Sequence, residues 1–301
     1  MSRVATIPLQ RVMAGAISGA QEKLAITQKQ LSTGKRATDF ASLGTESVRN
    51  LSAHSLLEQQ KAQSNVAKRV GTTMSLYQGH IEGIQTTTTS LRQQILTALG
   101  TGQSAGLQQA MDSSFSQMRS SLNASEGGTP LFGGSQTDRA PFAVTKLADA
   151  AGVPVDQAFR DDNVLASARV ADGLDVTYGV NASSMGSGIY DAYRAMAQMG
   201  PIGETLSDAQ KTALAGVISK LDTGLKQLGA VNADNGRKQN QIEDVTTRGE
   251  ERSLLLQQVI EDNEDADLGQ VAVDLAQQKT VLEASYSVFS QLSSLSLVKY
   301  L

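Results

Sequence analysis

The chain contains no cysteine and no tryptophan, and only 4% of its 301 residues are aromatic. Without cysteine it has no disulfide, no thiolate metal ligand and no cysteine nucleophile. Because bulky aromatic residues are so few, the core must be built from many aliphatic side chains. Such a composition is better suited to long packed helices than to a compact enzyme with a deep pocket.

Long apolar runs are also missing. No stretch approaches the ~18 apolar residues that a membrane-spanning helix requires. Polar residues interrupt the N-terminal segment where a cleavable signal peptide would need its apolar centre. The formal net charge is −4, which argues against nucleic acid as a partner. We therefore expect a protein that has no cleavable signal peptide and binds neither membranes nor nucleic acid.

The residue types that carry catalysis or bind metals are scarce and scattered. The two histidines, His54 and His80, fall in one predicted helix, roughly 39 Å apart along its axis. Gly34-Lys35 lacks the frame of a phosphate-binding loop. The acidic run 261–267 lacks the glycine and the final glutamate of a calcium loop. We predict no catalytic residue, no cofactor and no metal, and the chain is not expected to be an enzyme.

Apolar residues recur at heptad spacing near both ends of the chain. Such a narrow stripe is typical of a helix that a coiled-coil partner covers. The predicted assembly seam consists of Ile17, Leu24, Leu31, Leu268, Val271, Leu275, Leu282, Phe289 and Leu292. Because both ends carry such a seam, the simplest fold places the two terminal helices side by side.

The segment LSTGKRATDF, residues 31–40, interrupts the helical pattern between the first two predicted helices. Gly34 can adopt the left-handed conformation that ends a helix. The chain is rich in cations before residue 70 and in anions between 243 and 283, and these segments could bind separate partners or pack against each other. We expect the cations of the turn to meet acidic groups such as those of 261–267. The predicted helix-turn signature is Gly34, Lys35, Arg36 and Asp39.

The middle of the chain has a different pattern. The helical period disappears between 130 and 185, and two β-prone runs flank Asp172-Gly173, a pair suited to a hairpin turn. We predict a mainly α fold with a small β insertion, in which both chain ends build a long antiparallel helical hairpin or coiled-coil bundle. The predicted parts are an N-terminal assembly helix (1–40), a helical core in two halves (41–129 and 186–262), a β-rich tip domain (130–185) and a C-terminal assembly helix (263–301).

Two segments resemble the signatures of a known family. QLSTGKRATDFASLG (30–44) is similar to the N-terminal signature of flagellins and hook-associated proteins, and EDNEDADLGQVAVDLAQQKTVLEASY (261–286) is similar to their C-terminal signature. Three further segments resemble the hook–filament junction branch of that family more than filament flagellins: PLFGGSQTDRAPF (130–142), RVADGLDVTYGVNAS (169–183) and SLSLVKYL (294–301).

This resemblance implies a secreted structural subunit of the bacterial flagellum that serves motility and is exported by the flagellar type III apparatus. It implies a cytoplasmic export chaperone, and self-association in a ring at the hook–filament junction. The neighbours would be a hook-associated protein on one side and flagellin on the other. The narrow seams favour terminal segments, about 1–40 and 265–301, that become ordered on assembly. A filament flagellin is one alternative, and a cell-surface flagellin homologue that binds a glycan is another, from a different functional class.

Overall fold

The computed structural model describes residues 3–37, 39 and 41–297, with side chains described for 11–37, 39 and 43–291. In this part of the chain the fold is mainly α with two small antiparallel strand pairs, as predicted. The chain divides into two compact units. Unit 1 is Met1–Gln59 with Arg252–Leu301, and unit 2 is Gln60–Glu251. No helix among the described residues is both long and apolar enough to cross a membrane.

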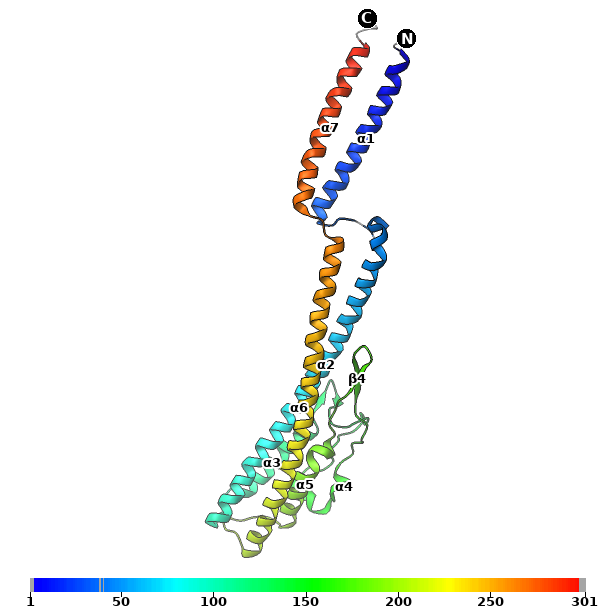
Figure 1. Ribbon diagram of the computed structural model, residues 1–301. Helices are drawn as coiled ribbons and strands as arrows, with labels where there is room; N and C mark the ends of the chain where they lie inside the picture. Colours follow the sequence, from blue (N-terminus) through cyan, green and yellow to red (C-terminus); the bar gives the residue numbers. More distant parts are fainter. Residues whose placement is uncertain (1–2, 38, 40, 298–301) are drawn as a thin grey trace. The chain divides into compact units, whose positions relative to one another are not determined.

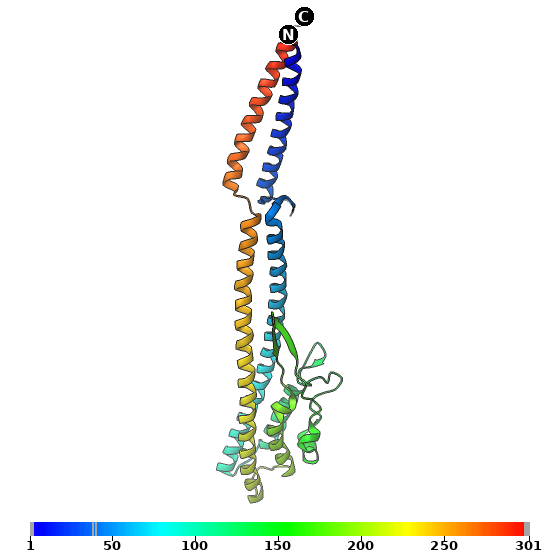
Figure 2. The same cartoon turned by 45° about the vertical axis from the view of Figure 1, so that its right-hand side comes forward.

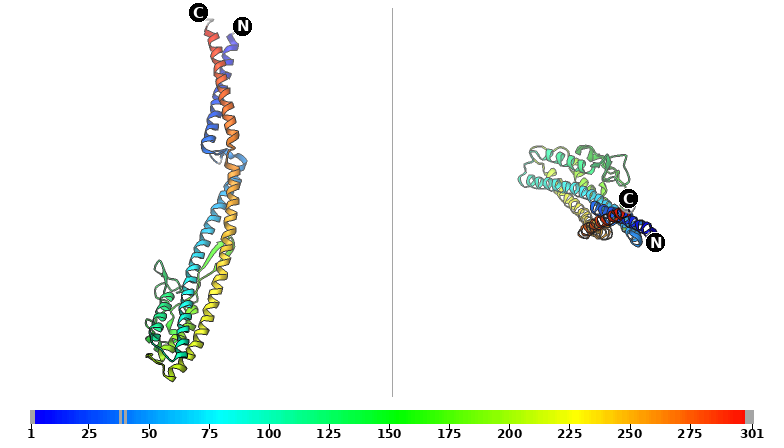
Figure 3. Two further views of the ribbon diagram at one scale, coloured as in Figure 1. Left: turned by 90° about the vertical axis from the view of Figure 1, so that its left-hand side faces the viewer. Right: turned by 90° about the horizontal axis from the view of Figure 1, so that it is seen from above.

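Unit 1 is made of helices from both ends of the chain. Helices α1 (Arg3–Thr33) and α7 (Leu268–Leu297) run antiparallel and side by side in every view (Figures 1, 2 and 3). The short 3-10 helix η1 (Ala41–Glu46) leads into α2 (Ser47–Thr101), whose first turns lie beside the last turns of α6 (Asp208–Glu264). Those turns share a small buried cluster formed by Ala53, Leu57 and Ile260. The chain thus forms two successive antiparallel helix pairs within this unit.

Unit 2 is a helical bundle with one continuous core. The remaining parts of α2 and α6 share this core with α3 (Leu107–Leu122) and α5 (Ala182–Gln198). Its largest fully buried side chains are the aromatic residues Tyr190, Tyr193, Phe115, Phe132 and Phe142, followed by methionine, isoleucine and leucine side chains such as Met74, Ile81 and Leu91. Many aliphatic residues build the core, as the composition predicts, but the scarce aromatic residues contribute its largest side chains. Arg92 and Asp222 tie α2 to α6 through an ion pair with two hydrogen bonds of 2.6 and 3.2 Å.

The segment between α3 and α5 contains the small β insertion. Strand β1 (Ser125–Glu126) pairs with β2 (Thr129–Pro130), and β3 (Ser167–Ala171) pairs with β4 (Leu174–Thr177) (Figure 2). The turn between β3 and β4 is Asp172-Gly173, which confirms the predicted hairpin. Apart from the 3-10 helix η2 (Leu147–Gly152) and the one-turn helix α4 (Val155–Ala158), the rest is irregular. Packing of side chains, more than strand pairing, therefore holds this segment.

Phe132 and Phe142 anchor the insertion to the helical bundle, and both are fully buried. The ring of Phe142 lies edge-on to Tyr190 of α5, with 5.3 Å between the ring centroids. The side chain of Asn123 also binds the backbone of Phe142. The Asn123 side-chain nitrogen donates to the Phe142 carbonyl oxygen at 2.9 Å, and Asn123 Oδ1 accepts from the Phe142 N–H at 2.8 Å. The scarce aromatic residues are thus concentrated where the insertion meets the helices.

Asp162 connects two loops of the insertion. Its carboxylate accepts hydrogen bonds from the hydroxyl of Ser135, from the Ser135 N–H at 2.8 Å, from the side chain of Gln136 at 3.0 Å and from the Val164 N–H at 3.1 Å. These bonds favour the ionised form, and the bond from the Ser135 hydroxyl contributes most. They hold the pKa of Asp162 well below its ordinary value.

Replacing Asp162 with asparagine should therefore destabilise the protein more at neutral pH than in acid. The lowered pKa means that ionised Asp162 stabilises the folded state above the unfolded pKa of about 3.9, and that this contribution is lost as the pH falls through the folded value. Urea denaturation at pH 7 and pH 3 measures the effect, with the exposed Asp138 changed to asparagine as a control. An equal loss of stability at both pH values would contradict this assignment.

Candidate assembly site

Helices α1 and α7 meet along a seam with heptad spacing. Residues three and four positions apart lie on one face of a helix, so each helix presents one stripe to the other. Most of the predicted seam residues lie on these stripes and are buried or half-buried: Ile17, Leu24, Val271, Leu275, Leu282 and Phe289. The role of these residues in assembly remains a prediction.

Leu31 and Leu268 lie outside the buried part of the seam. Leu31 is 42% exposed and Leu268 is 49% exposed. Leu31 belongs to the last turn of α1, and Leu268 is the first residue of α7, so both lie where the chain leaves the helix pair. The heptad pattern therefore extends further in the sequence than the burial does in the structure. Leu292 lies in α7, but its side chain is outside the described residues.

Polar contacts fill part of the seam. The Thr27 hydroxyl donates to Gln278 Oε1 at 3.0 Å, and the Gln21 side chain donates to the Tyr286 hydroxyl at 2.5 Å. Thr27 is itself buried, although it is polar. Since such contacts replace apolar side chains at seam positions, the pair gains little hydrophobic stabilisation from its own interface.

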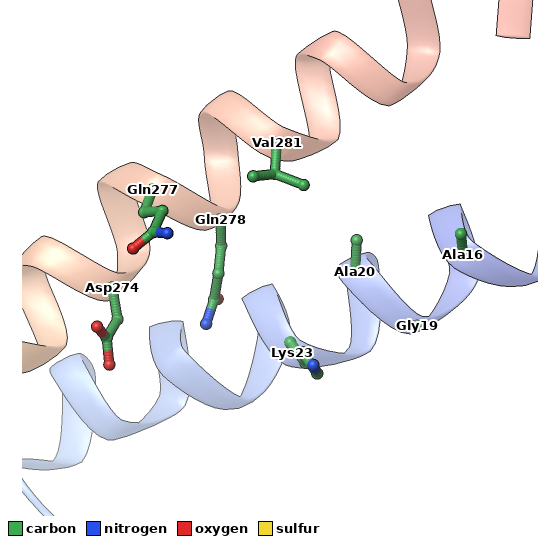
Figure 4. A pocket seen from close by; sticks show the side chains of 8 residues that line it. All are labelled: Ala16, Gly19, Ala20, Lys23, Asp274, Gln277, Gln278 and Val281. Atoms are coloured by element: carbon green, nitrogen blue, oxygen red, sulfur yellow. The ribbon is translucent and has the colours of Figure 1, made fainter. Parts of the chain in front are cut away.

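A groove of about 560 Å³ lies between α1 and α7 (Figure 4). Small side chains on α1 leave this space open, and amide, acidic and aliphatic side chains of α7 line the other side. The lining residues are Ala16, Gly19, Ala20, Lys23, Asp274, Gln277, Gln278 and Val281. Nowhere in the described residues do three or more potential metal ligands gather. The groove has the size and lining to receive side chains of another helix.

The same helix pair exposes several large apolar side chains. Among residues 11–37 and 268–291 these are Val12, Ile26, Leu31, Leu268, Val273, Val281, Tyr286 and Val288, each at least 42% exposed. Exposed apolar residues are normal when they occur singly. Because several lie on the same two helices, this pair is the candidate surface for assembly.

The break after α1 lies beside the break between α6 and α7. Gly34 has a φ of 69°, and its N–H donates to the Gln30 carbonyl oxygen at 2.8 Å, so α1 ends where predicted. The Arg36 N–H donates to the Glu264 carbonyl oxygen at 2.6 Å, and the Ala266 N–H donates to the Gly34 carbonyl oxygen at 2.9 Å. These bonds form an antiparallel bridge centred on Lys35 and Asp265. We call residues 34–37 and 264–267 the joint.

The two cations of the joint bind different acidic groups. Lys35 Nζ lies 2.6 Å from Asp265 Oδ1 and 3.4 Å from Glu264 Oε2, which confirms the expected contact with the acidic run. The hydrogen bond to Asp265 is the main reason that the pKa of Lys35 is raised. Arg36 pairs instead with Glu46 of η1, because successive side chains of an extended segment point to opposite sides. Asp39 is exposed between two residues that the structure does not describe.

Glu264 links the joint to α2. Its Oε1 accepts a hydrogen bond from Asn50 Nδ2 at 2.7 Å and lies 2.6 Å from His54 Nε2. Burial favours the neutral acid, but the hydrogen bonds from His54, Asn50 and Lys35 outweigh it and lower the pKa of Glu264. Sequence reasoning missed this network, because His54 and Glu264 lie far apart along the chain. The only signal for this network in the sequence was the negative charge of the acidic run 261–267, which includes Glu264.

Comparison with known proteins finds similarity to flagellar proteins. The model of the bacterial flagellin C-terminal helical region matches residues 218–301. Flagellar hook-associated protein 3 of Escherichia coli (strain K12) is 25% identical in an alignment of 291 residues that covers 89% of this chain and 90% of that protein. The resemblance to flagellins and hook-associated proteins is thereby confirmed.

Two solved structures of hook-associated proteins have a similar fold. The structure of a putative flagellar hook-associated protein from Vibrio parahaemolyticus has a TM-score of 0.62 and 17% identity, and the match covers 73% of this chain and 97% of that one. Bacillus cereus FlgL has a TM-score of 0.56 and 16% identity, with 70% and 98% covered. At these identities the likeness establishes the fold alone. Together with the sequence matches, it supports a structural role in the flagellum.

Proposed function

We propose that this protein is the junction subunit between flagellar hook and filament. The observation that carries this assignment is the match to hook-associated protein 3 over 89% of this chain and 90% of that protein. In this role the chain is secreted through the flagellar type III apparatus and assembles into a ring with further copies. A hook-associated protein adjoins it on the hook side and flagellin on the filament side. From the family we also infer that it is not an enzyme.

The terminal helix pair supports assembly as the mechanism. Its own seam is thin, a groove of about 560 Å³ stays open, and Ile26 and Val273 are 52% and 59% exposed. Fully covering one aliphatic side chain contributes at most about 1.5–3 kcal/mol, so covering several adds stabilisation that the thin seam does not supply. Within the segments 1–40 and 265–301, helices α1 and α7 would then pair only weakly in the single chain and become fully stabilised in the assembled ring.

The same surface accounts for the need for a chaperone. Before export, exposed apolar side chains of unassembled copies would associate with one another. A cytoplasmic chaperone that covers these helices would prevent this and keep the chain competent for export. The absence of cysteine means that no disulfide forms to hinder passage of the unfolded chain.

A strain that lacks the gene should retain its hooks, lose its filaments and release unpolymerised flagellin into the medium. Electron microscopy of the cells and immunoblots of the medium measure these three outcomes. Filaments that are shortened, with no flagellin released, would support the alternative that the chain is itself a filament flagellin. Normal filaments and normal motility would contradict both.

Complementation with single variants tests the terminal surface in the same strain. The wild-type chain should restore filaments, and Ile26→Asp should not, because it places a charge on an apolar surface that copies cover. Gln28→Asp is the matched control, since Gln28 is an exposed polar residue of the same helix. Secretion of each variant is followed by immunoblot, so that failure of export is distinguished from failure of assembly.

A further inference from the structure

The α1–α7 seam does little to fix the stagger of one helix along the other. A slip by one heptad, about 10 Å along the axis, again places seam positions opposite seam positions. Along the described part of the seam Ile17, Thr27 and Val271 are buried, whereas the remaining side chains are half-buried or exposed. The contact between Thr27 and Gln278 favours one stagger. A single hydrogen bond of this kind contributes only about 1 kcal/mol.

The joint fixes the stagger from outside the seam. The hydrogen bonds between Arg36 and Glu264 and between Ala266 and Gly34 flank the bridge, so residue 35 has to lie opposite residue 265. Only a few residues separate each helix from this bridge, because α1 ends at Thr33 and α7 starts at Leu268. These short connections leave little freedom for either helix to shift along its axis.

Asp267 fixes the residue at which helix α7 begins. Asp267 Oδ1 accepts hydrogen bonds from the N–H groups of Gly269 at 2.9 Å and Gln270 at 3.1 Å, which is an N-cap arrangement. The Val271 N–H donates to the Asp267 carbonyl oxygen at 2.9 Å, so the first regular helical bond follows at once. The first turn of α7 thus has a set position relative to the bridge.

The joint itself is held by the second helix pair of unit 1. Glu264 accepts a hydrogen bond from Asn50 and lies within hydrogen-bond distance of His54, both on α2. Ala53, Leu57 and Ile260 form the buried cluster of that helix pair. None of these contacts involves α1 or α7, so this anchorage does not depend on the α1–α7 seam.

We propose that the joint sets the stagger of α1 against α7 and starts their pairing. The bridge brings the two helices together at one end, and the pair then closes from the joint toward the chain termini in a single register. The inference concerns the single chain, and it extends the proposed function by supplying every copy with the same surface for assembly.

The absence of cysteine makes the register measurable by cross-linking in the full-length chain. Thr27→Cys with Gln278→Cys reports the observed stagger, because these two side chains are in contact. Thr27→Cys with Val271→Cys reports a slip by one heptad. Cross-linking with a short thiol-reactive linker, followed on denaturing gels, should be much faster for the first pair than for the second in an otherwise wild-type chain.

Disrupting the joint should reduce this preference. Ala266→Pro removes the N–H that donates to Gly34, and Lys35→Ala removes the ion pair with Asp265 and Glu264. Together they should lower the ratio of the two cross-linking rates about tenfold, as the loss of one hydrogen bond and one ion pair implies. Lys35→Ala with Asp265→Ala, which leaves the backbone unchanged, should act in the same direction by a smaller factor.

Two control variants separate the joint from general perturbation. Ala37→Pro places a proline in the same segment and removes neither hydrogen bond of the bridge. Lys29→Ala removes an exposed cation of α1 outside the joint. Both should keep the wild-type ratio, and circular dichroism should show unchanged helix content for every variant.

An unchanged ratio in both joint variants would overturn the proposal. Equal rates for the two cysteine pairs in the wild-type background would also overturn it, because no register would then be selected. The assay uses the monomer and contains neither hook nor filament. Its outcome is therefore independent of whether the chain serves at the junction or in the filament.

Discussion

Replacing Phe142 with alanine should lower the free energy of unfolding of unit 2 by about 3–5 kcal/mol, the usual cost of removing a buried phenylalanine ring. Phe142 is 1% exposed. Its ring centroid lies 5.2 Å from that of Phe159, 5.3 Å from that of Tyr190 and 6.0 Å from that of Phe115. Loss of the ring therefore opens a cavity between the insertion, α3 and α5 at once.

Urea denaturation of the full-length chain, followed by circular dichroism and by tyrosine fluorescence, measures this loss. Phe142→Leu is the graded control, because it keeps an apolar side chain in the same space and should cost less than alanine. The backbone hydrogen bonds with Asn123 remain possible in both variants. A loss below about 1 kcal/mol for the alanine variant would show that the insertion is not anchored by this ring.

Replacing Gly224 with alanine should also destabilise the protein, by about 1–3 kcal/mol, since it overfills a close contact. A Cβ atom at position 224 of α6 would lie 2.7 Å from the backbone nitrogen of Ile189 and 2.8 Å from the carbonyl carbon of Gly188. Both atoms belong to the backbone of α5, so the two helices would have to move apart. This cost opposes the ordinary preference of a helix for alanine over glycine, which is about 1 kcal/mol.

Gly216→Ala is the matched control on the same helix. A Cβ atom there would meet nothing within 4 Å. That substitution should stabilise the protein by about 0.5–1 kcal/mol, because alanine loses less conformational entropy than glycine on folding. Thermal and urea denaturation should thus give shifts of opposite sign for the two variants. A stabilising effect of Gly224→Ala would contradict the close crossing of α5 and α6.

Features that depend on neighbouring residues could be predicted from the sequence. The end of α1 at Gly34 and the hairpin at Asp172-Gly173 both follow from local backbone preferences. Heptad spacing likewise indicated the two terminal helices. Leu31 and Leu268 are exposed although they continue the heptad pattern, because periodicity continues to the end of a helix whereas burial requires a partner at the same level. The role of the seam in assembly stays a prediction.

Apart from the contact between Lys35 and the acidic run, contacts between distant segments could not be predicted from the same patterns. Nothing near His54 in the sequence indicates Glu264, and nothing near Gly188 indicates Gly224. The insertion was expected to be richer in strands, but most of its order comes from aromatic side chains that pack on α3 and α5. Such packing depends on which surfaces meet in three dimensions, and a one-dimensional pattern does not contain that information.

The network at Glu264 also bears on how this region can change during evolution. One carboxylate serves Lys35, Asn50 and His54, which belong to two separate segments of the chain. Effects of substitution at these positions are therefore not additive, since loss of Glu264 removes one contact from each of the three at once, although Lys35 keeps its ion pair with Asp265. Each of these contacts exists only while the shared carboxylate is present. Viable sequences are expected to keep the whole set or to replace its members together.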